Sequence, residues 1–282
     1  MRILITFLAV FSAVGHSEET PLRTSNDVVY ASYGERELLL DWYRPDDGEM
    51  YPGIVIVHGG GWTGGTRRGF RTTAEDLASS GYVVVNIEYR LAGEAKFPAA
   101  VLDVKAAVRW MRANATVLGL NPGKIGAVGG SAGGHLAALV AATAGDAAFP
   151  VEVHPGQSDA LQAAVIMGAG VDQVARVKES KTGSIKSCVI FFGGEYDEVP
   201  DVYENGSPIT HLSATTPPIL MLDGEFDRPG ERYVDYRKKL DSFSVTNEFV
   251  MVPGAKHGEW GKDAFRPAFV AAMLDFLNAQ LK

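Results

Sequence analysis

Short apolar runs alternate with stretches of helical periodicity along most of the chain. The clearest run, residues 53–58, reads Gly-Ile-Val-Ile-Val-His, with β-branched residues at successive positions. Such a run is typical of a strand buried on both faces of a sheet. The longest helical pattern covers residues 97–113, and its apolar face carries Val101, Val104, Val108 and Met111. Together these patterns predict buried strands covered by helices.

The rest of the chain divides into elements of the same two kinds. The predicted strands are residues 27–33, 37–43, 53–58, 83–87, 124–128, 161–167, 219–223 and 248–252, and the predicted helices are residues 72–80, 97–113, 134–144 and 264–281. This alternation predicts an α/β fold with a mostly parallel sheet of about eight strands, an antiparallel start and helices on both faces. Residues 170–210, rich in Lys, Glu, Gly and Asp, are expected to leave the sheet as a small lid-like excursion.

The first 17 residues have the pattern of a secretory signal peptide. Arg2 is the only charged residue before Glu18, and residues 3–14 are apolar apart from Thr6 and Ser12. An apolar run of this length is too short to span a bilayer as a helix. We therefore expect cleavage near residues 15–17 and a secreted or periplasmic protein, with a buried N-terminal element as the alternative. Since Cys188 is the only cysteine, the chain cannot form an intrachain disulfide.

Composition narrows the possible partners. The chain has 282 residues, of which 46% are hydrophobic, and it carries 26 Lys and Arg against 34 Asp and Glu. The net charge of −8 argues against nucleic acid or an anionic membrane surface, because clustered basic charge binds both. It favours a small uncharged substrate and no stable membrane insertion after cleavage. Residues 18–282 are expected to form one domain.

Three motifs follow predicted strands, where ligands bind in such sheets. The first, Gly129-Gly-Ser-Ala-Gly133, lies between a strand and a helix. A serine on a sharp strand-to-helix turn is an exposed nucleophile, and small residues two positions away allow the turn to close. Ser131 is therefore the predicted nucleophile. The alternative is a glycine-rich turn with an incidental serine.

The second motif is His58-Gly-Gly-Gly-Trp62. Its glycines allow backbone N–H groups to point into a cavity and, with the N–H of Ala132, to form an oxyanion hole. Residues Gly59, Gly61 and Gly64 also match a dinucleotide-binding fingerprint, with Glu88 as the ribose-binding acid. That fingerprint requires a helix that begins directly after the glycines, whereas residues 62–71 look like an extended loop.

The third motif is a pair of late polar loops. Strand 219–223 leads into a loop that contains Asp227, and strand 248–252 leads into a loop that contains His257. The order Ser131, Asp227, His257 is that of an α/β-hydrolase triad. In this interpretation His257 is the general base and Asp227 orients its ring.

These motifs resemble those of α/β-hydrolase carboxylesterases. HGGGW, YRLA after Glu88, FPAAVLDVKAAVRWMRANA, GGSAGGHLAAL, SPITHLSATTPPIL and VPGAKHG extend over about residues 50–260, and together they are similar to the bacterial feruloyl and acetylxylan esterase-like group and to hormone-sensitive-lipase-type esterases. The resemblance implies Ser131 as nucleophile, Asp227 as acid and His257 as base. It also implies oxyanion donors at Gly60, Gly61 and Ala132.

One departure from the family pattern leaves the identity of the triad acid undecided. Where the family has His-Gly before the acid loop, this chain has Asp223-Gly224, so that Asp223 competes with Asp227. Asp197, in Phe-Gly-Gly-Glu-Tyr-Asp-Glu, is a third candidate. Asp227 is favoured because the stretch after residue 200 resembles the segment that the family places before its last catalytic strand.

The sequence thus predicts a serine esterase without metal or cofactor, since it has no H-E-x-x-H motif or paired Cys/His spacing. From the resemblance, its substrates are acetyl or feruloyl esters of polysaccharides. Trp62 and Trp260 are expected as an aromatic wall of the substrate pocket, or else as packing residues at its rim. A serine peptidase of the same superfamily and a non-catalytic binding protein are the alternatives.

Overall fold

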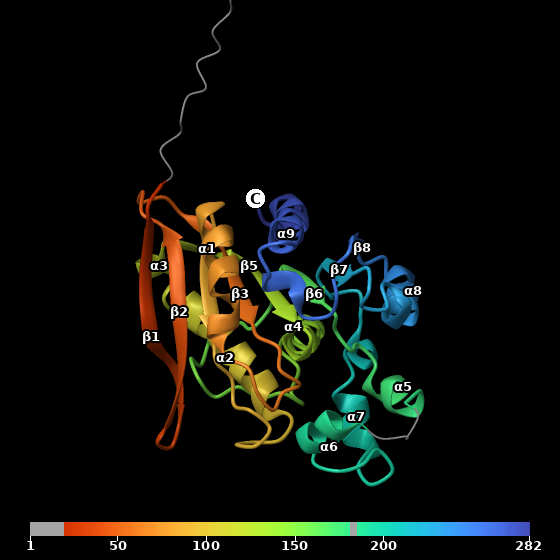
Figure 1. Ribbon diagram of the computed structural model, residues 1–282. Helices are drawn as coiled ribbons and strands as arrows, with labels where there is room; N and C mark the ends of the chain where they lie inside the picture. The colour runs from red at the N-terminus through yellow and green to blue at the C-terminus, as the bar shows by residue number, and fades with distance from the viewer. Residues whose placement is uncertain (1–19, 181–184) are drawn as a thin grey trace, which may run out of the picture.

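Eight strands pair into one sheet in the order β1-β2-β4-β3-β5-β6-β7-β8 (Figure 1). The computed structural model describes residues 20–180 and 185–282, and the predicted signal peptide lies outside that part of the chain. The strands are β1 Leu22–Tyr33, β2 Arg36–Pro45, β3 Tyr51–Val57, β4 Val83–Ile87, β5 Leu120–Gly130, β6 Ala163–Met167, β7 Ile219–Gly224 and β8 Asn247–Val252. Pairs β1–β2 and β2–β4 are antiparallel, and every other pair is parallel. The predicted sheet is confirmed.

The central strands are buried because helices cover both faces. On one face lie α1 Arg71–Ser79 and α9 Arg266–Leu281, and on the other lie α2 Ala99–Ala113, α4 Ala132–Ala142 and α8 Val234–Ser242. In β3, Val55 and Val57 face the core under α2 and α4, while Ile54 and Ile56 face the core under α1 and α9. An uninterrupted apolar run therefore fits a strand that packs on both sides.

A group of short helices separates β6 from β7. They are α5 Gln173–Lys178, α6 Lys186–Phe192, α7 Pro200–Asn205 and the 3₁₀ turn η2 Pro208–His211. Figure 1 shows α5, α6 and α7 together at one end of the molecule, away from α1 and α9. This is the segment expected to leave the sheet.

The structure adds helices to those predicted and shifts others. Helix α4 begins at Ala132, directly after the serine, and not at residue 134. Helix α8 was not predicted, because only Tyr236 and Leu240 of its nine residues are buried and its apolar stripe is sparse. The short α3, Ala115–Leu118, also lies in a segment without helical periodicity. The loop after β3 includes a 3₁₀ turn, η1 Arg67–Phe70.

Candidate active site

Ser131 occupies a strained turn between β5 and α4. Its backbone has φ 54° and ψ −117°, a conformation that a non-glycine residue adopts at a cost of order 1–3 kcal/mol. Backbone atoms lie so close to Gly129 and Gly133 that neither position has room for a side chain. A Cβ on Gly129 would lie 2.2 Å from the Gly133 carbonyl oxygen, and one on Gly133 would lie 2.1 Å from the Val57 oxygen. The glycines of the motif thus allow the turn to pack against β3.

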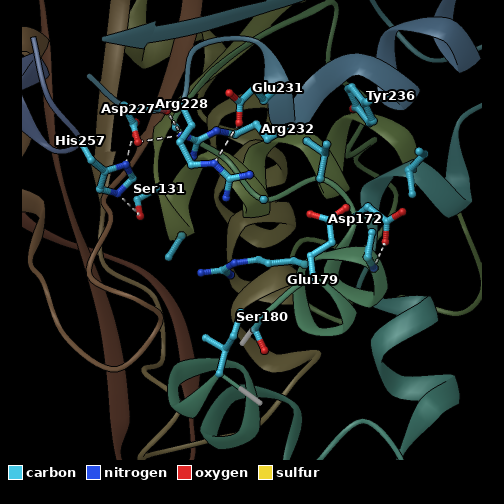
Figure 2. Close-up of a pocket in the computed structure, with 18 of the residues that line it drawn as sticks. Ser131, Asp172, Glu179, Ser180, Asp227, Arg228, Glu231, Arg232, Tyr236 and His257 are labelled. Carbon is cyan, nitrogen blue, oxygen red and sulfur yellow. Dashed lines mark hydrogen bonds and ion pairs between the residues drawn. The ribbon is translucent and has the colours of Figure 1, made fainter. Parts of the chain in front are cut away.

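His257 connects the serine to an acid. Its Nε2 lies 3.0 Å from Ser131 Oγ, and its Nδ1 lies 2.8 Å from Asp227 Oδ2. Figure 2 shows the three side chains in a row along one side of a pocket. They come from three loops at the carboxyl ends of β5, β7 and β8. The structure therefore brings together the three residues expected from the sequence, in hydrogen-bonding order.

Asp227 is only 8% exposed and is held as a carboxylate. Arg232 donates from Nη2 to Asp227 Oδ1 at 2.7 Å and also to the backbone oxygen of the same residue. Burial opposes ionisation, but hydrogen bonds from His257 and Arg232 and the positive charge of Arg232 outweigh it, so the pKa of Asp227 lies below its usual value. Asp227 can therefore stabilise a positive charge on the adjacent imidazole.

Asp223 hydrogen-bonds to three other groups, and His257 is not among them. Its Oδ1 accepts hydrogen bonds from Gly168 N at 3.0 Å and from the Tyr233 hydroxyl at 3.2 Å, and its Oδ2 accepts one from Gly230 N at 3.2 Å. Burial raises the pKa of this carboxyl, which is 1% exposed. Asp223 thus ties the loop after β7 to the end of β6. Asp197, the third candidate, lies exposed in the turn between α6 and α7.

Two of the three expected oxyanion donors line the pocket that holds the serine. Gly61 and Ala132 line the pocket with Ser131, and Gly60 precedes them in the same loop as Gly61. Within residues 20–180 and 185–282, the N–H groups of Gly60, Gly61 and Ala132 have no hydrogen-bond acceptor. Ala132 N lies at the start of α4, where the helix dipole adds positive potential. These groups are free to bind an oxyanion.

The two tryptophans have different positions. Trp62 lines the pocket but is 2% exposed; it stacks on Phe191 with ring centroids 4.7 Å apart. Trp260 does not line the pocket. It packs under Gly130 and meets the His257 ring edge to face at 5.2 Å, so it supports the histidine from the core side. Of the expected aromatic wall, only Trp62 faces the cavity.

Trp62 is anchored by a buried histidine of α4. Its Nε1–H donates to His135 Nδ1 at 3.2 Å, while His135 Nε2 donates to the Gly206 oxygen at 2.7 Å. Burial lowers the pKa of His135 to about 4, and the charge of Arg176 acts in the same direction. A neutral His135 thus connects the loop that carries Trp62 to the segment after α7.

The pocket has a volume of about 450 Å³, within the range of small-molecule sites. Charged side chains line much of it, including Arg176, Arg228, Arg232, Glu179 and Glu231. Neither Arg176 nor Arg232 belongs to a sequence motif identified above. No signal in one sequence shows that these arginines line the pocket of Ser131, because the segments that carry them are placed by tertiary packing.

The alternative dinucleotide site does not fit the observed loop. Helix α1 begins only at Arg71, after the 3₁₀ turn, and not directly behind the glycines. Glu88 forms ion pairs with Arg67 and Arg36. Across the residues that the structure describes, no three His, Cys, Asp or Glu side chains are grouped so as to hold a metal ion, and no helix is long and apolar enough to cross a membrane.

Comparisons with known proteins identify related esterases. The BD-FAE family model matches residues 40–237. Esterase LipC of Mycobacterium tuberculosis is 31% identical over 80% of this chain, but the match spans 58% of LipC. A truncated carbohydrate esterase from gut microbiota superposes with a TM-score of 0.75 at 26% identity, covering 94% of this chain and 98% of that one. Butyrate-bound esterase Est2 of Thermogutta terrifontis gives 0.74 at 27% identity, covering 93% and 94%.

The buried His135 predicts a loss of stability in mild acid. Since an unfolded histidine takes up a proton near pH 6.5 and folded His135 only near pH 4, the free energy of unfolding should fall as the pH drops between these values. The full contribution is roughly 3 kcal/mol. Urea unfolding at several pH values should show a steeper loss for the wild type than for His135→Gln. Equal slopes for wild type and His135→Gln would contradict the assignment.

Proposed function

The chain belongs to the BD-FAE family of α/β-hydrolases, and on this premise we propose that it is a serine carboxylic ester hydrolase that works through an acyl-enzyme. One observation carries the proposal: Ser131, His257 and Asp227 are hydrogen-bonded in series at 3.0 and 2.8 Å beside free backbone N–H groups. This is the arrangement that ester hydrolysis by a serine requires.

In the first half of the reaction, Ser131 Oγ attacks the ester carbonyl carbon. His257 Nε2 accepts the hydroxyl proton, and Asp227 stabilises the imidazolium that forms. The carbonyl oxygen becomes an oxyanion and receives hydrogen bonds from Gly61, Ala132 and Gly60 N–H groups. One such donor is worth about 3 kcal/mol to a transition state. The bond to the alcohol oxygen then breaks, and His257 returns the proton to the leaving alcohol.

Water completes the cycle. His257 accepts a proton from a water molecule, whose oxygen attacks the acyl carbon on Ser131. The second tetrahedral intermediate collapses with return of the proton to Ser131 Oγ, which releases the carboxylic acid. The lowered pKa of Asp227 supports both halves, because the carboxylate stays ionised while the imidazole gains and loses its proton.

We propose acetyl or feruloyl esters of polysaccharides as the substrate class. The motifs resemble those of feruloyl and acetylxylan esterases, and one structural neighbour is described as a carbohydrate esterase. Another neighbour carries butyrate, a short acyl product. A pocket of about 450 Å³ has room for a short or an aromatic acyl group and part of the alcohol.

We also propose that residues 1–17 direct export. The support is the single early charge at Arg2, followed by an apolar run and small residues. A secreted or periplasmic enzyme would meet extracellular polysaccharide.

Replacing the nucleophile tests the proposed chemistry. Ser131→Ala should lower kcat on 4-nitrophenyl acetate, methyl ferulate and acetylated xylan by at least about 10⁴-fold, since no other group forms the acyl-enzyme. Labelling by a fluorophosphonate should also be lost, with melting temperature preserved. Ser187→Ala, which changes a serine that lies beside Gly61 but does not line the pocket, is the control and should retain activity. Wild-type turnover in Ser131→Ala would overturn the mechanism.

Two aspartate variants separate the acid from its neighbour. Asp227→Asn should lower kcat by roughly 10⁴-fold, because an amide cannot stabilise the imidazolium. Asp223→Asn should keep kcat within about tenfold but lose about 1–3 kcal/mol of stability, because one of its three hydrogen bonds loses an acceptor. Steady-state kinetics and urea unfolding measure the two effects. The assignment fails if Asp223→Asn is the inactive variant and Asp227→Asn is not.

Export is tested by expressing the full chain and residues 18–282 in a Gram-negative host. The full chain should reach the periplasm, with an intact mass that corresponds to cleavage near residues 15–17. The shorter chain should remain in the cytoplasm. An uncleaved full chain in the cytoplasmic fraction would contradict export.

A further inference from the structure

Arg176 of α5 brings a positive charge into the pocket that holds Ser131 and Ala132. Its guanidinium carbon lies 5.7 Å from the centre of the Trp62 ring, and Trp62 directly follows the oxyanion glycines. The arginine therefore lies beside the side chain that follows the proposed oxyanion glycines, in the same pocket as Ser131. The reaction derived above makes no use of it.

The arginine is held in place by groups that leave its charge unbalanced. Nη1 donates to Gln173 Oε1 at 3.2 Å and lies 3.5 Å from Cys188 Sγ, and both partners are buried. Trp62 supplies an aromatic face below the guanidinium. None of these groups is an anion in the folded protein, because burial raises the pKa of the Cys188 thiol. The guanidinium is positioned, yet its charge is not neutralised.

The other arginines of the pocket differ in this respect. Arg228 pairs with Glu231 at 3.1 Å, and Arg232 pairs with Asp227 at 2.7 Å and with Asp223 at 3.7 Å. Within the described ranges 20–180 and 185–282, Arg176 has no carboxylate within 4.0 Å. Among the arginines lining the described pocket, it alone has an unpaired charge.

The carboxylates of the pocket do not neutralise it either. Asp172 accepts a hydrogen bond from Ala175 N at 2.8 Å and thereby caps α5, and Asp235 pairs with Lys238 at 2.9 Å. Glu179 is exposed one turn beyond Arg176, and among the described residues no ion pair joins the two. In Figure 2, Asp172 and Glu179 lie across the pocket from the Ser131 and His257 side chains. A negative group bound beside the serine would therefore find Arg176 available.

We propose that Arg176 binds a carboxylate of the ester substrate, so that the enzyme prefers acidic esters. The inference rests on the proposed ester hydrolysis at the same site and specifies its substrate class. A guanidinium has five N–H donors, and the two on Nη1 point to Gln173 and Cys188, which leaves Nε and Nη2 for a paired contact with two carboxylate oxygens. The carboxylate belongs either to the acyl group, as in a dicarboxylic half-ester, or to the alcohol, as in a uronic acid that is acylated on a hydroxyl group and keeps its carboxylate free.

Matched substrates test the proposal on each side of the ester bond. For the acyl side, 4-nitrophenyl hemiglutarate is compared with 4-nitrophenyl valerate, which has nearly the same length and no charge. For the alcohol side, glucuronic acid acetylated on a hydroxyl group is compared with the methyl ester of the same acetylated sugar, which has no charge. The wild type should prefer the acidic member of at least one pair by about tenfold or more in kcat/KM, mainly through KM, and the preference should weaken as salt increases. The pair that shows the preference identifies the source of the carboxylate.

Arg176→Gln should abolish that preference while changing kcat/KM on the neutral esters by less than about threefold. Arg176→Lys should restore part of it, since lysine keeps the charge but not the paired geometry. Arg228→Gln is the matched control, because that arginine lines the same pocket but is paired and 74% exposed; it should keep the wild-type preference.

Absence of a preference in the wild type for both pairs would overturn the proposal. An equal loss on acidic and neutral esters in Arg176→Gln would also overturn it and would indicate a purely structural role. If the neutral esters are hydrolysed in either case, the proposed function stands without the inference. If no ester of any kind is hydrolysed, the proposed function itself fails.

Discussion

The register of the parallel strands is the constraint on which the site depends. Val57 pairs with Gly129, Gly129 with Ile166, Met167 with Leu222, and Gly224 with Val252. The strands β3, β5, β6, β7 and β8 therefore end at one edge of the sheet. Loops that are far apart in sequence therefore begin side by side. The serine turn adds a close approach, because its glycines allow the first turn of α4 to pack against the end of β3. Without this register, the motifs would be unrelated loops.

Charge in the pocket is arranged locally and does not follow the charge of the whole chain. The net charge of −8 favours an uncharged substrate when the chain is treated as a whole. Three acidic side chains near the serine are already engaged, however, since Asp227 hydrogen-bonds to the histidine, Asp223 ties two loops together and Asp172 caps a helix. Local pairing thus leaves a single uncompensated arginine among those lining the described pocket. Net charge averages over the surface, so it carries no information about a cavity of this size.

The sequence predicted an element correctly where its local pattern is compatible with only one kind of secondary structure. Buried strands are recognised by consecutive β-branched residues, and all eight predicted strands are present, with ends that differ by a few residues. It failed for α5, α6, α7 and α8, which are short or largely polar and owe their helical state to packing against the rest of the protein. Helix α4 was predicted two residues late, because glycine lowers helix propensity although Gly133 and Gly134 lie inside the helix.

The sequence by itself determined the α/β class and the motifs that carry Ser131 and His257, because glycine spacing and strand-end position are properties of the local chain. Only the tertiary structure shows that Asp227, and not Asp223, hydrogen-bonds to His257. The two lie four residues apart in one acidic segment, and the direction of each side chain depends on contacts with Gly168, Arg232 and the ring of His257. The same holds for the tryptophans and for Arg176, whose surroundings come from distant segments. Local motifs identify the residue types that the reaction needs. Which of several similar side chains lies in the site depends on distances between segments that are far apart in sequence, and the spacing of residues along the chain does not give these distances.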